Sequence, residues 1–308
     1  MTKSCRNGIC ECPSRLNYYS QGILAQELSA DSNSNQTYIA ASYVKFVEGA
    51  GAQVVPIFVN RNESYVRDIF SKINGVLFPG GGVYFSPTNG TGGYVDTGRL
   101  LYKLAKEAND AGDYFPVWGT CLGFELMMYL DADGGVDPRA TCGAWNVVEK
   151  LKFTKETMTS NLFSSAPKAI VNSLSSLPLT ANFHRLCLTP ENFTTFGLSK
   201  SYSALSINYD STSNLTYIST VAHRHYPFYA VQFHPEKNIY EWTTKEKLPH
   251  SAKAIAVGQY FANFFIAQAR RNTHKFATVE EENKYLIYNY SPQFVGADGS
   301  TFIQKYFF

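Results

Sequence analysis

Strand-like and helix-like segments alternate along the first 130 residues, and this alternation limits the chain to very few folds. Short apolar runs are each followed by a longer segment whose apolar side chains recur at helical spacing. The predicted strands are residues 21–28, 52–59, 114–120 and the start of 74–82, and the predicted helices are residues 37–51, 63–73, 97–113 and the run after 121. The strand runs are almost continuously apolar, as in parallel strands covered on both faces. We therefore predict an α/β fold, flavodoxin-like, with a mostly parallel central sheet and helices on both faces.

The second half of the chain has a different pattern. In residues 140–235, short runs rich in Thr, Tyr, Val and Ile are separated by polar loops, which predicts added antiparallel strands. A long helix is expected over residues 251–271, and the aromatic tail after it is expected to pack on the surface. No repeat or linker divides the chain, so we expect residues 21–308 to form a single domain and leave residues 1–20 unplaced.

Composition excludes several classes of partner. The net charge is +2 with 17% charged residues and no basic stripe, so nucleic acid is not an expected partner. The longest apolar segment, residues 252–269, is broken by Lys and Gln, so no membrane span is expected. Cys5, Cys10 and Cys12 lack a second cluster with zinc-like spacing, and we predict neither a metal nor a cofactor. The three remaining cysteines are scattered and suggest no disulfide framework.

The chain carries more Asn-x-Ser/Thr sequons than its composition would give by chance. These possible N-glycosylation sites are Asn35, Asn62, Asn89, Asn192, Asn214 and Asn289. Their number favours a protein of the secretory pathway, although no signal peptide is readable at the N-terminus.

Two loops follow predicted strands at the edge where parallel sheets bind ligands. One is the glycine-rich "PGGG" ending at Gly82, and the other is "GTCLG" around Cys121. A cysteine between two glycines in a strand-to-helix turn resembles a nucleophile elbow, and a helix N-terminus favours its thiolate. The backbone N–H groups of Leu122 and of Gly81 or Gly82 would then stabilise an oxyanion. The alternative is a small buried cysteine in an ordinary turn.

A cysteine nucleophile needs a base, and one histidine stands out. His234 in "YAVQFHPEK" directly follows an apolar strand, and Pro235 ends that strand. Glu236 lies two residues further on, so its carboxylate can reach back to the imidazole. Cys121, His234 and Glu236 thus form a candidate nucleophile, base and orienting carboxylate. The alternatives are a structural histidine at a strand end and a solvated loop charge.

These motifs together resemble a known superfamily. Gly-x-Cys-x-Gly after a strand, with His-Pro-Glu roughly a hundred residues later, is similar to class I glutamine amidotransferases. Longer stretches resemble the γ-glutamyl hydrolase family within it, and the likeness runs from about residue 21 to 308. These stretches are "YIAASYVKFVEGAGAQVVP", "INGVLFPGGG", "GDYFPVWGTCLGFE", "PLTANFH" and "YAVQFHPEKNIYEW".

The resemblance implies a lysosomal or extracellular peptidase, often a homodimer, that cleaves the γ-linked glutamate tail of folates and antifolates without metal or cofactor. It makes Cys121 the nucleophile, His234 the general base and acid, and Glu236 a supporting carboxylate. The family also keeps residues near its site that match Tyr43, Glu125, His184 and Gln232.

The roles of these four residues stay open at this point. His184 either contacts the substrate or packs in the core, and Tyr43 has the helical spacing of a core residue. Glu125 and Gln232 could be hydrogen-bond partners that hold the elbow and the histidine. A polyanionic tail also needs a cation, and the unranked candidates are Arg185, Lys200, Arg224 and Lys237.

We therefore expect hydrolysis through a thioester on Cys121. Two alternatives use the same fold. One is a glutaminase-type amidotransferase that releases ammonia from glutamine, although no synthase domain is visible. The other is a catalytically inactive, secreted binding protein, against which the intact Cys, His and Glu set argues.

Overall fold

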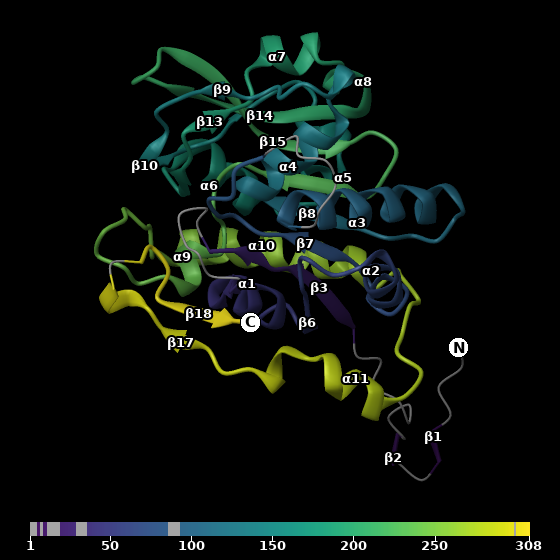
Figure 1. Ribbon diagram of the computed structural model, residues 1–308. Helices are drawn as coiled ribbons and strands as arrows, with labels where there is room; N and C mark the ends of the chain where they lie inside the picture. The colour runs from purple at the N-terminus through teal and green to yellow at the C-terminus, as the bar shows by residue number, and fades with distance from the viewer. Residues whose placement is uncertain (1–4, 7–8, 11–18, 29–35, 86–92, 299) are drawn as a thin grey trace.

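An eight-stranded sheet lies at the centre of the computed structural model (Figure 1). Its strands, in spatial order, are β11 (Lys152–Phe153), β14 (Tyr202–Asp210), β15 (Leu215–His223), β16 (Phe228–Val231), β8 (Val117–Thr120), β7 (Val76–Phe78), β3 (Ser20–Leu24) and β6 (Gln53–Ile57). The strands from β16 to β6 pair in parallel, and those from β11 to β16 pair antiparallel. The predicted α/β sheet with an antiparallel addition is confirmed. The structure describes residues 5–6, 9–10, 19–28, 36–85, 93–298 and 300–308.

Helices cover both faces of the sheet, as the apolar strands require. Neighbouring side chains of β8 enter opposite halves of the core, with Trp118 on one face and Val117 on the other. Helices α1 (Ala41–Glu48) and α10 (Ala252–Ala269) pack on the face of Trp118. Helices α2 (Glu63–Phe70), α3 (Gly93–Asp110) and α4 (Leu122–Asp131) pack on the face of Val117.

The other elements are short and surround this core. The strands are β1 (Cys5–Arg6), β2 (Ile9–Cys10), β4 (Gln26–Glu27), β5 (Thr37–Ala40), β9 (Ala140–Thr141), β10 (Trp145–Glu149), β12 (Thr180–Phe183), β13 (Leu186–Cys187), β17 (Gln293–Phe294) and β18 (Gln304–Phe307). The helices are α5 (Asn161–Ser164), α6 (Lys168–Ser176), α7 (Pro190–Thr195), α8 (Leu198–Ser201), α9 (Lys237–Tyr240) and α11 (Val279–Tyr285). Within the described ranges, no helix has the length and apolarity that crossing a bilayer requires.

The predicted helix over residues 37–51 is wrong at its start. Residues 37–40 form β5, and α1 begins only at Ala41. The cause is distant in the sequence, because β18 from the C-terminus pairs with β5, and Thr37 and Phe308 exchange two backbone hydrogen bonds of 3.1 and 2.9 Å. The predicted strand 21–28 is likewise split into β3 and β4, because β4 leaves the central sheet to pair with β5.

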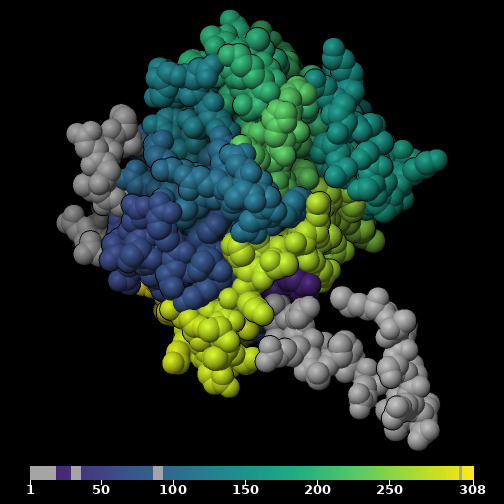
Figure 2. Space-filling model, turned by 90° about the vertical axis from the view of Figure 1, so that its right-hand side faces the viewer, coloured from purple at the N-terminus to yellow at the C-terminus, as the bar shows by residue number. Residues whose placement is uncertain are grey.

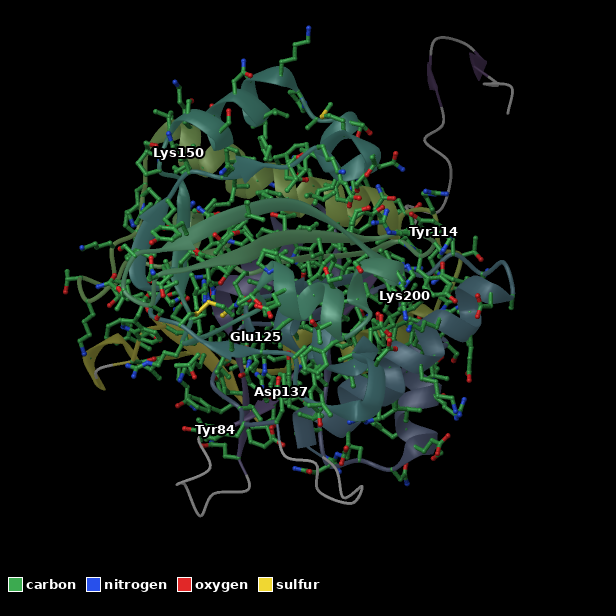
Figure 3. The ribbon with its side chains drawn as sticks, turned by 90° about the horizontal axis from the view of Figure 1, so that it is seen from above. Tyr84, Tyr114, Glu125, Asp137, Lys150 and Lys200 are labelled. Carbon is green, nitrogen blue, oxygen red and sulfur yellow. A yellow bond between two sulfur atoms is a disulfide. The ribbon has the colours of Figure 1, made fainter. Side chains whose placement is uncertain are left out.

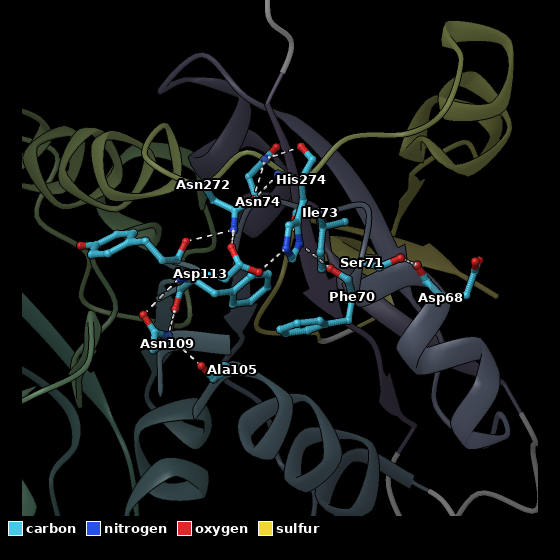
Figure 4. A network of polar contacts seen from close by, with 12 residues as sticks. Asp68, Phe70, Ser71, Ile73, Asn74, Ala105, Asn109, Asp113, Asn272 and His274 are labelled. Carbon is cyan, nitrogen blue, oxygen red and sulfur yellow. Dashed lines mark hydrogen bonds and ion pairs between the residues drawn. The ribbon is translucent and has the colours of Figure 1, made fainter. Parts of the chain in front are cut away.

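Polar contacts hold the chain after α10 against the first half of the protein. In Figure 2 this segment, in yellow, lies against the blue surface of α2 and α3. Figure 4 shows the contacts: His274 is 2.6 Å from a carboxylate oxygen of Asp113 through Nε2, and its Nδ1 lies 3.0 Å from the carbonyl oxygen of Phe70. Asn272 and Asn74 join the same network through a hydrogen bond of 3.1 Å. The tail after residue 271 is therefore anchored to the edges of the helical layer.

Close packing of α4 on β7 depends on a glycine. A Cβ atom at Gly123 would overlap the backbone carbonyl of Phe78, which cannot rotate away as a side chain can. We expect Gly123→Ala to lower the free energy of unfolding by about 3 kcal/mol, because the strand and the helix must separate. Urea unfolding measures this loss. Gly82→Ala is the matched control, since a Cβ there meets no atom within 4 Å, and equal stability of the two variants would contradict the expectation.

Candidate active site

Cys121 occupies the turn between β8 and α4, as its sequence context predicts. It is the residue before the first turn of α4, and its φ of 51° and ψ of −104° are unusual for a residue other than glycine. Its backbone N–H donates to the carbonyl oxygen of Val231 at 2.8 Å, so β16 holds the turn in place. Such strain at a buried cysteine is typical of a nucleophile elbow.

Burial, together with the carboxylates of Glu125 and Glu236, raises the pKa of the Cys121 thiol well above its usual value. The charge of Lys237 and a hydrogen bond from the N–H of Leu122 act in the opposite direction and are outweighed. The sequence led us to expect a thiolate, and this expectation requires correction. Desolvation penalises the charged form more than the helix N-terminus favours it, so the resting group is a thiol that needs a base.

His234 lies at the end of the strand next to β8. Strands β16 and β8 are parallel, with Val231 opposite Thr120, so the two loops that follow them meet at one edge of the sheet. His234 is buried, and its backbone N–H donates to Ala181 at 2.9 Å. Its Nδ1 lies 2.7 Å from Oε1 of Glu236. A proton on Nδ1 that is donated to this carboxylate leaves Nε2 as the free basic nitrogen.

Gly80 is the residue of the "PGGG" loop that lies beside both Cys121 and His234. A Cβ atom built there would lie 2.7 Å from Cε1 of His234 and 3.1 Å from Cβ of Cys121. The imidazole and the cysteine therefore both contact the same glycine of the "PGGG" loop, which follows β7. The structure brings together the nucleophile, the base and the glycine-rich loop, each at the carboxyl end of a neighbouring strand.

Tyr43 is buried, yet its hydroxyl group belongs to the site. The hydroxyl accepts a hydrogen bond of 2.8 Å from the N–H of Gly80 and lies 3.3 Å from Nδ1 of His234. Burial raises the pKa of Tyr43 well above its usual value, and Glu236 and Cys121 raise it further, so the phenol stays protonated. Because the N–H of Gly80 already donates to Tyr43, an oxyanion donor on this loop must be the N–H of a later residue. No hydrogen bond within the described part of the chain engages the N–H of Gly81 or Gly82.

Tyr43→Phe tests this positioning role. Loss of the hydroxyl leaves the N–H of Gly80 unpaired and frees His234 to shift, so we expect kcat to fall about tenfold to a hundredfold with little change in KM. The matched control is Tyr94→Phe, because the hydroxyl of Tyr94 donates to the carbonyl of Pro79 at 3.0 Å on the same loop. A similar loss of kcat in both variants, measured alongside thermal unfolding, would assign Tyr43 a purely structural role.

Glu125 and Gln232 connect the segment that holds Cys121 to the segment that holds His234. The Gln232 amide donates to Oε1 of Glu125 at 3.1 Å, which links the strand before His234 to the helix after Cys121. Arg139, which the sequence did not single out, binds the other oxygen of Glu125 at 2.7 Å and Asp137 at 2.7 Å. Figure 3 shows Glu125 and Asp137 near each other, as their shared partner Arg139 requires. Burial raises the pKa of Glu125, and Arg139 opposes this increase.

His184 lies outside the catalytic cluster. Its Nδ1 is 3.3 Å from Sγ of Cys187 and 3.2 Å from the carbonyl of Leu186. Burial, and next the charge of His234, lower the pKa of His184 to about 3, so the ring is neutral. Cys187 forms a disulfide with Cys142 that no sequence pattern indicated (Figure 3). The packing alternative for His184 thus agrees with its position beside this disulfide.

A cavity of about 590 Å³ opens onto the cysteine and the imidazole. Its lining combines the three loops with the C-terminal tail, and consists of Tyr38, Gly81, Gly82, Cys121, Trp145, Phe183, His234, Lys237, Glu246, Val295, Ser300, Thr301, Phe302 and Lys305. The tail packs on the surface of the domain as expected, and it also builds one wall of this cavity, which the sequence did not indicate. A second cavity of about 710 Å³ lies near the amino ends of β8 and β16 and contains none of the predicted catalytic residues.

The four basic residues considered as partners for a polyanionic tail lie at different distances from the cavity of Cys121. Of the four, only Lys237 lines the cavity of Cys121. Arg224 pairs with Glu156 and Lys200 with Asp133, both away from that cavity. Arg185 lies over the ring of Trp145, 4.8 Å from its centroid, and does not itself line the cavity.

The chain is similar to several known proteins. The family model described as Peptidase C26 matches residues 20–236. The γ-glutamyl hydrolase of Bos taurus is 42% identical over 273 residues, which cover 88% of this chain and 83% of the bovine protein. The Homo sapiens γ-glutamyl hydrolase is 40% identical over 290 residues, covering 93% and 88%. The γ-glutamyl hydrolase B of Dictyostelium discoideum is 39% identical, covering 89% and 78%.

A solved structure supports the fold. The glutaminase domain of Trypanosoma brucei CTPS with bound acivicin superimposes with a TM-score of 0.53 at 14% identity, covering 83% of this chain and 95% of that domain. At this identity the likeness concerns the arrangement of the strands and helices alone.

Proposed function

The chain belongs to the peptidase C26 family and hydrolyses γ-glutamyl bonds, and on this premise we propose that its substrates are folyl and antifolyl poly-γ-glutamates, cleaved through a thioester on Cys121. One observation carries the assignment of residues: Cys121 and His234 both lie beside Gly80, where a Cβ atom would clash with each, and Glu236 is 2.7 Å from the imidazole. A nucleophile, a base and an orienting carboxylate in this order support acyl transfer.

The proposed reaction begins with a protonated thiol. His234 takes the thiol proton on Nε2 as the sulfur of Cys121 attacks the γ-carbonyl carbon. The N–H of Leu122 and that of Gly81 or Gly82 stabilise the oxyanion. Collapse of this intermediate breaks the C–N bond, and the imidazolium gives its proton to the leaving amine. Water then attacks the thioester while His234 accepts its proton, and that proton returns to sulfur when the acid product leaves.

We also propose a lysosomal or extracellular location, where the sequons would carry glycans. The proposal is supported by the exposure of Asn62, Asn214 and Asn289. Asn192 is half-buried, which makes it the least exposed of the four. Its amide donates to the carbonyl of Pro138 at 2.8 Å, and the amide of Asn289 also donates to backbone carbonyls, at 2.8 and 2.9 Å. Asn35 and Asn89 lie outside the described residues.

The decisive test is incubation of the purified protein with pteroyl tri-γ-glutamate and separation of the products by chromatography. We expect release of glutamate or of a γ-linked glutamate peptide. A parallel assay offers free glutamine and measures ammonia. Ammonia release without cleavage of the tail would favour an amidotransferase, and tight binding with no turnover of either compound would favour the inactive binding protein.

A further inference from the structure

Two lysines and one carboxylate line the catalytic cavity, and they are not equivalent. Lys237 Nζ lies 2.6 Å from Oε2 of Glu246, and the side chains are 2% and 4% exposed. The ammonium also lies over the rings of Phe183 and Phe302, 4.5 and 4.8 Å from their centroids. The charge of Lys237 is therefore already compensated by a buried carboxylate and two aromatic faces.

Lys305 also lies over aromatic rings, but it lacks a carboxylate within ion-pair distance among the described residues. It lies on β18, the C-terminal strand that Figure 1 shows next to α1. Its Nζ is 4.4 Å from the ring centroid of Tyr38 and 5.6 Å from that of Phe302. Among the residues that the structure describes, Lys305 forms no ion pair. Burial lowers its pKa, and the more distant charge of Glu241 opposes this decrease without cancelling it. A partly desolvated ammonium that faces a cavity is stabilised by an anion that enters it.

The proposed substrate provides such an anion at every unit. A γ-linkage uses the side-chain carboxyl group, so each glutamate of the tail keeps a free α-carboxylate. Hydrogen bonds between an ammonium and a carboxylate are among the stronger polar contacts, more so where water is excluded.

The cavity also holds an unsatisfied acceptor. Oε1 of Glu246 is buried and has no hydrogen-bond partner within the described part of the chain, although its other oxygen binds Lys237. An amide N–H of a γ-linked chain is a donor of the kind this oxygen lacks. The lining thus presents a cation that forms no ion pair within the described residues and a carboxylate oxygen that lacks a donor, which matches the alternation of carboxylate and amide along the tail.

We propose that Lys305 is a specificity residue that binds one α-carboxylate of the γ-linked glutamate tail in the cavity of Cys121. The proposal depends on the function proposed above. It differs from the sequence-based candidates, because none of Arg185, Lys200 and Arg224 lines this cavity and Lys237 is neutralised by Glu246.

The test compares Lys305→Met, which keeps the length of the side chain, with Lys305→Arg, which keeps its charge. On pteroyl tri-γ-glutamate, we expect the methionine variant to raise KM by roughly tenfold to a hundredfold with little change in kcat. The arginine variant should recover most of that loss. Lys150→Met is the control, because Lys150 is exposed and does not line the cavity.

A series of substrates distinguishes binding from folding. Each α-carboxylate of the tail is replaced in turn by a carboxamide. At one position of the tail, the carboxamide should raise the KM of the wild-type protein by as much as Lys305→Met raises it on the parent substrate. The same carboxamide should cause no further increase in the KM of Lys305→Met. If Lys305→Met unfolds, Lys305→Gln serves in its place.

The outcomes separate the two proposals. Absence of tail cleavage by the wild-type protein overturns the proposed function itself. Cleavage by the wild type with an unchanged KM in Lys305→Met overturns the role of Lys305 alone. The role of Lys305 is also overturned if Lys305→Met raises KM, relative to the wild type, by the same factor on every carboxamide analogue. A distorted cavity rather than a lost ion pair would then be the cause.

Discussion

Replacement of Cys121 by alanine is expected to remove at least about 10⁴-fold of the hydrolysis rate while the fold persists. The sulfur is the one protein atom in the proposed mechanism that bonds to substrate carbon, so the acyl-enzyme cannot form without it. Alanine keeps the Cβ atom that the strained backbone already accommodates at a φ of 51°. We therefore expect far-UV circular dichroism and the thermal unfolding midpoint to change little, and the comparison of kcat with the wild type measures the effect.

Serine at position 121 is the complementary variant. A serine hydroxyl is a far weaker nucleophile at neutral pH, so this variant should be nearly as inactive as alanine despite its similar shape. Of the three cysteines whose side chains the structure describes, Cys121 is the free thiol, since Cys142 and Cys187 are joined. Retention of more than about one per cent of the activity in either variant would rule out the covalent mechanism.

Replacement of His234 by asparagine is expected to lower kcat by about 10³-fold or more. The effect is large because burial and two nearby carboxylates raise the pKa of the thiol, so the attack depends on a group that removes the proton. The same imidazole then protonates the leaving amine, so both halves of the reaction lose their proton carrier. Steady-state kinetics on the tri-γ-glutamate substrate checks the size of the loss.

Imidazole in the assay buffer provides a specific readout for this variant. A small base that enters the cavity should restore part of the rate to His234→Asn and none to Cys121→Ala. His225→Asn is the control, because His225 is exposed and lines the other cavity. Glu236→Gln should be impaired less than His234→Asn, since an amide oxygen can still accept from Nδ1. A loss below tenfold in His234→Asn would remove this residue from the mechanism.

Local patterns were sufficient to place the candidate nucleophile and base. Cys121 directly follows β8, His234 lies three residues after the end of β16, and the carboxyl ends of parallel strands share one edge. Local patterns could not identify Arg139, whose role depends on Glu125 across a loop of irregular structure. The supporting role of the Tyr43 hydroxyl was also hidden, because its helical spacing matches that of an ordinary core residue.

The wrong expectations have one physical cause. Residues 37–40 follow a helical pattern, but β18 offers them backbone partners from the far end of the chain, and paired strands replaced the first turn of the helix. The thiolate expected at a helix N-terminus was overridden by burial, which depends on all the elements packed around the cysteine. The disulfide between Cys142 and Cys187 requires two segments that the antiparallel pairing of β9 and β13 brings together.

By itself the sequence determined the alternation of strands and helices, the turn that holds Cys121 and the strand end that holds His234. These features arise from side-chain periodicity and from glycine and proline at turns, which act over a few residues. Only the tertiary structure decided that β16 lies beside β8, that the C-terminal strand closes the cavity, and that Lys305 faces it without an ionic partner among the described residues. Such contacts join residues far apart in the chain, and their free energy comes from burial and pairing that no local segment contains.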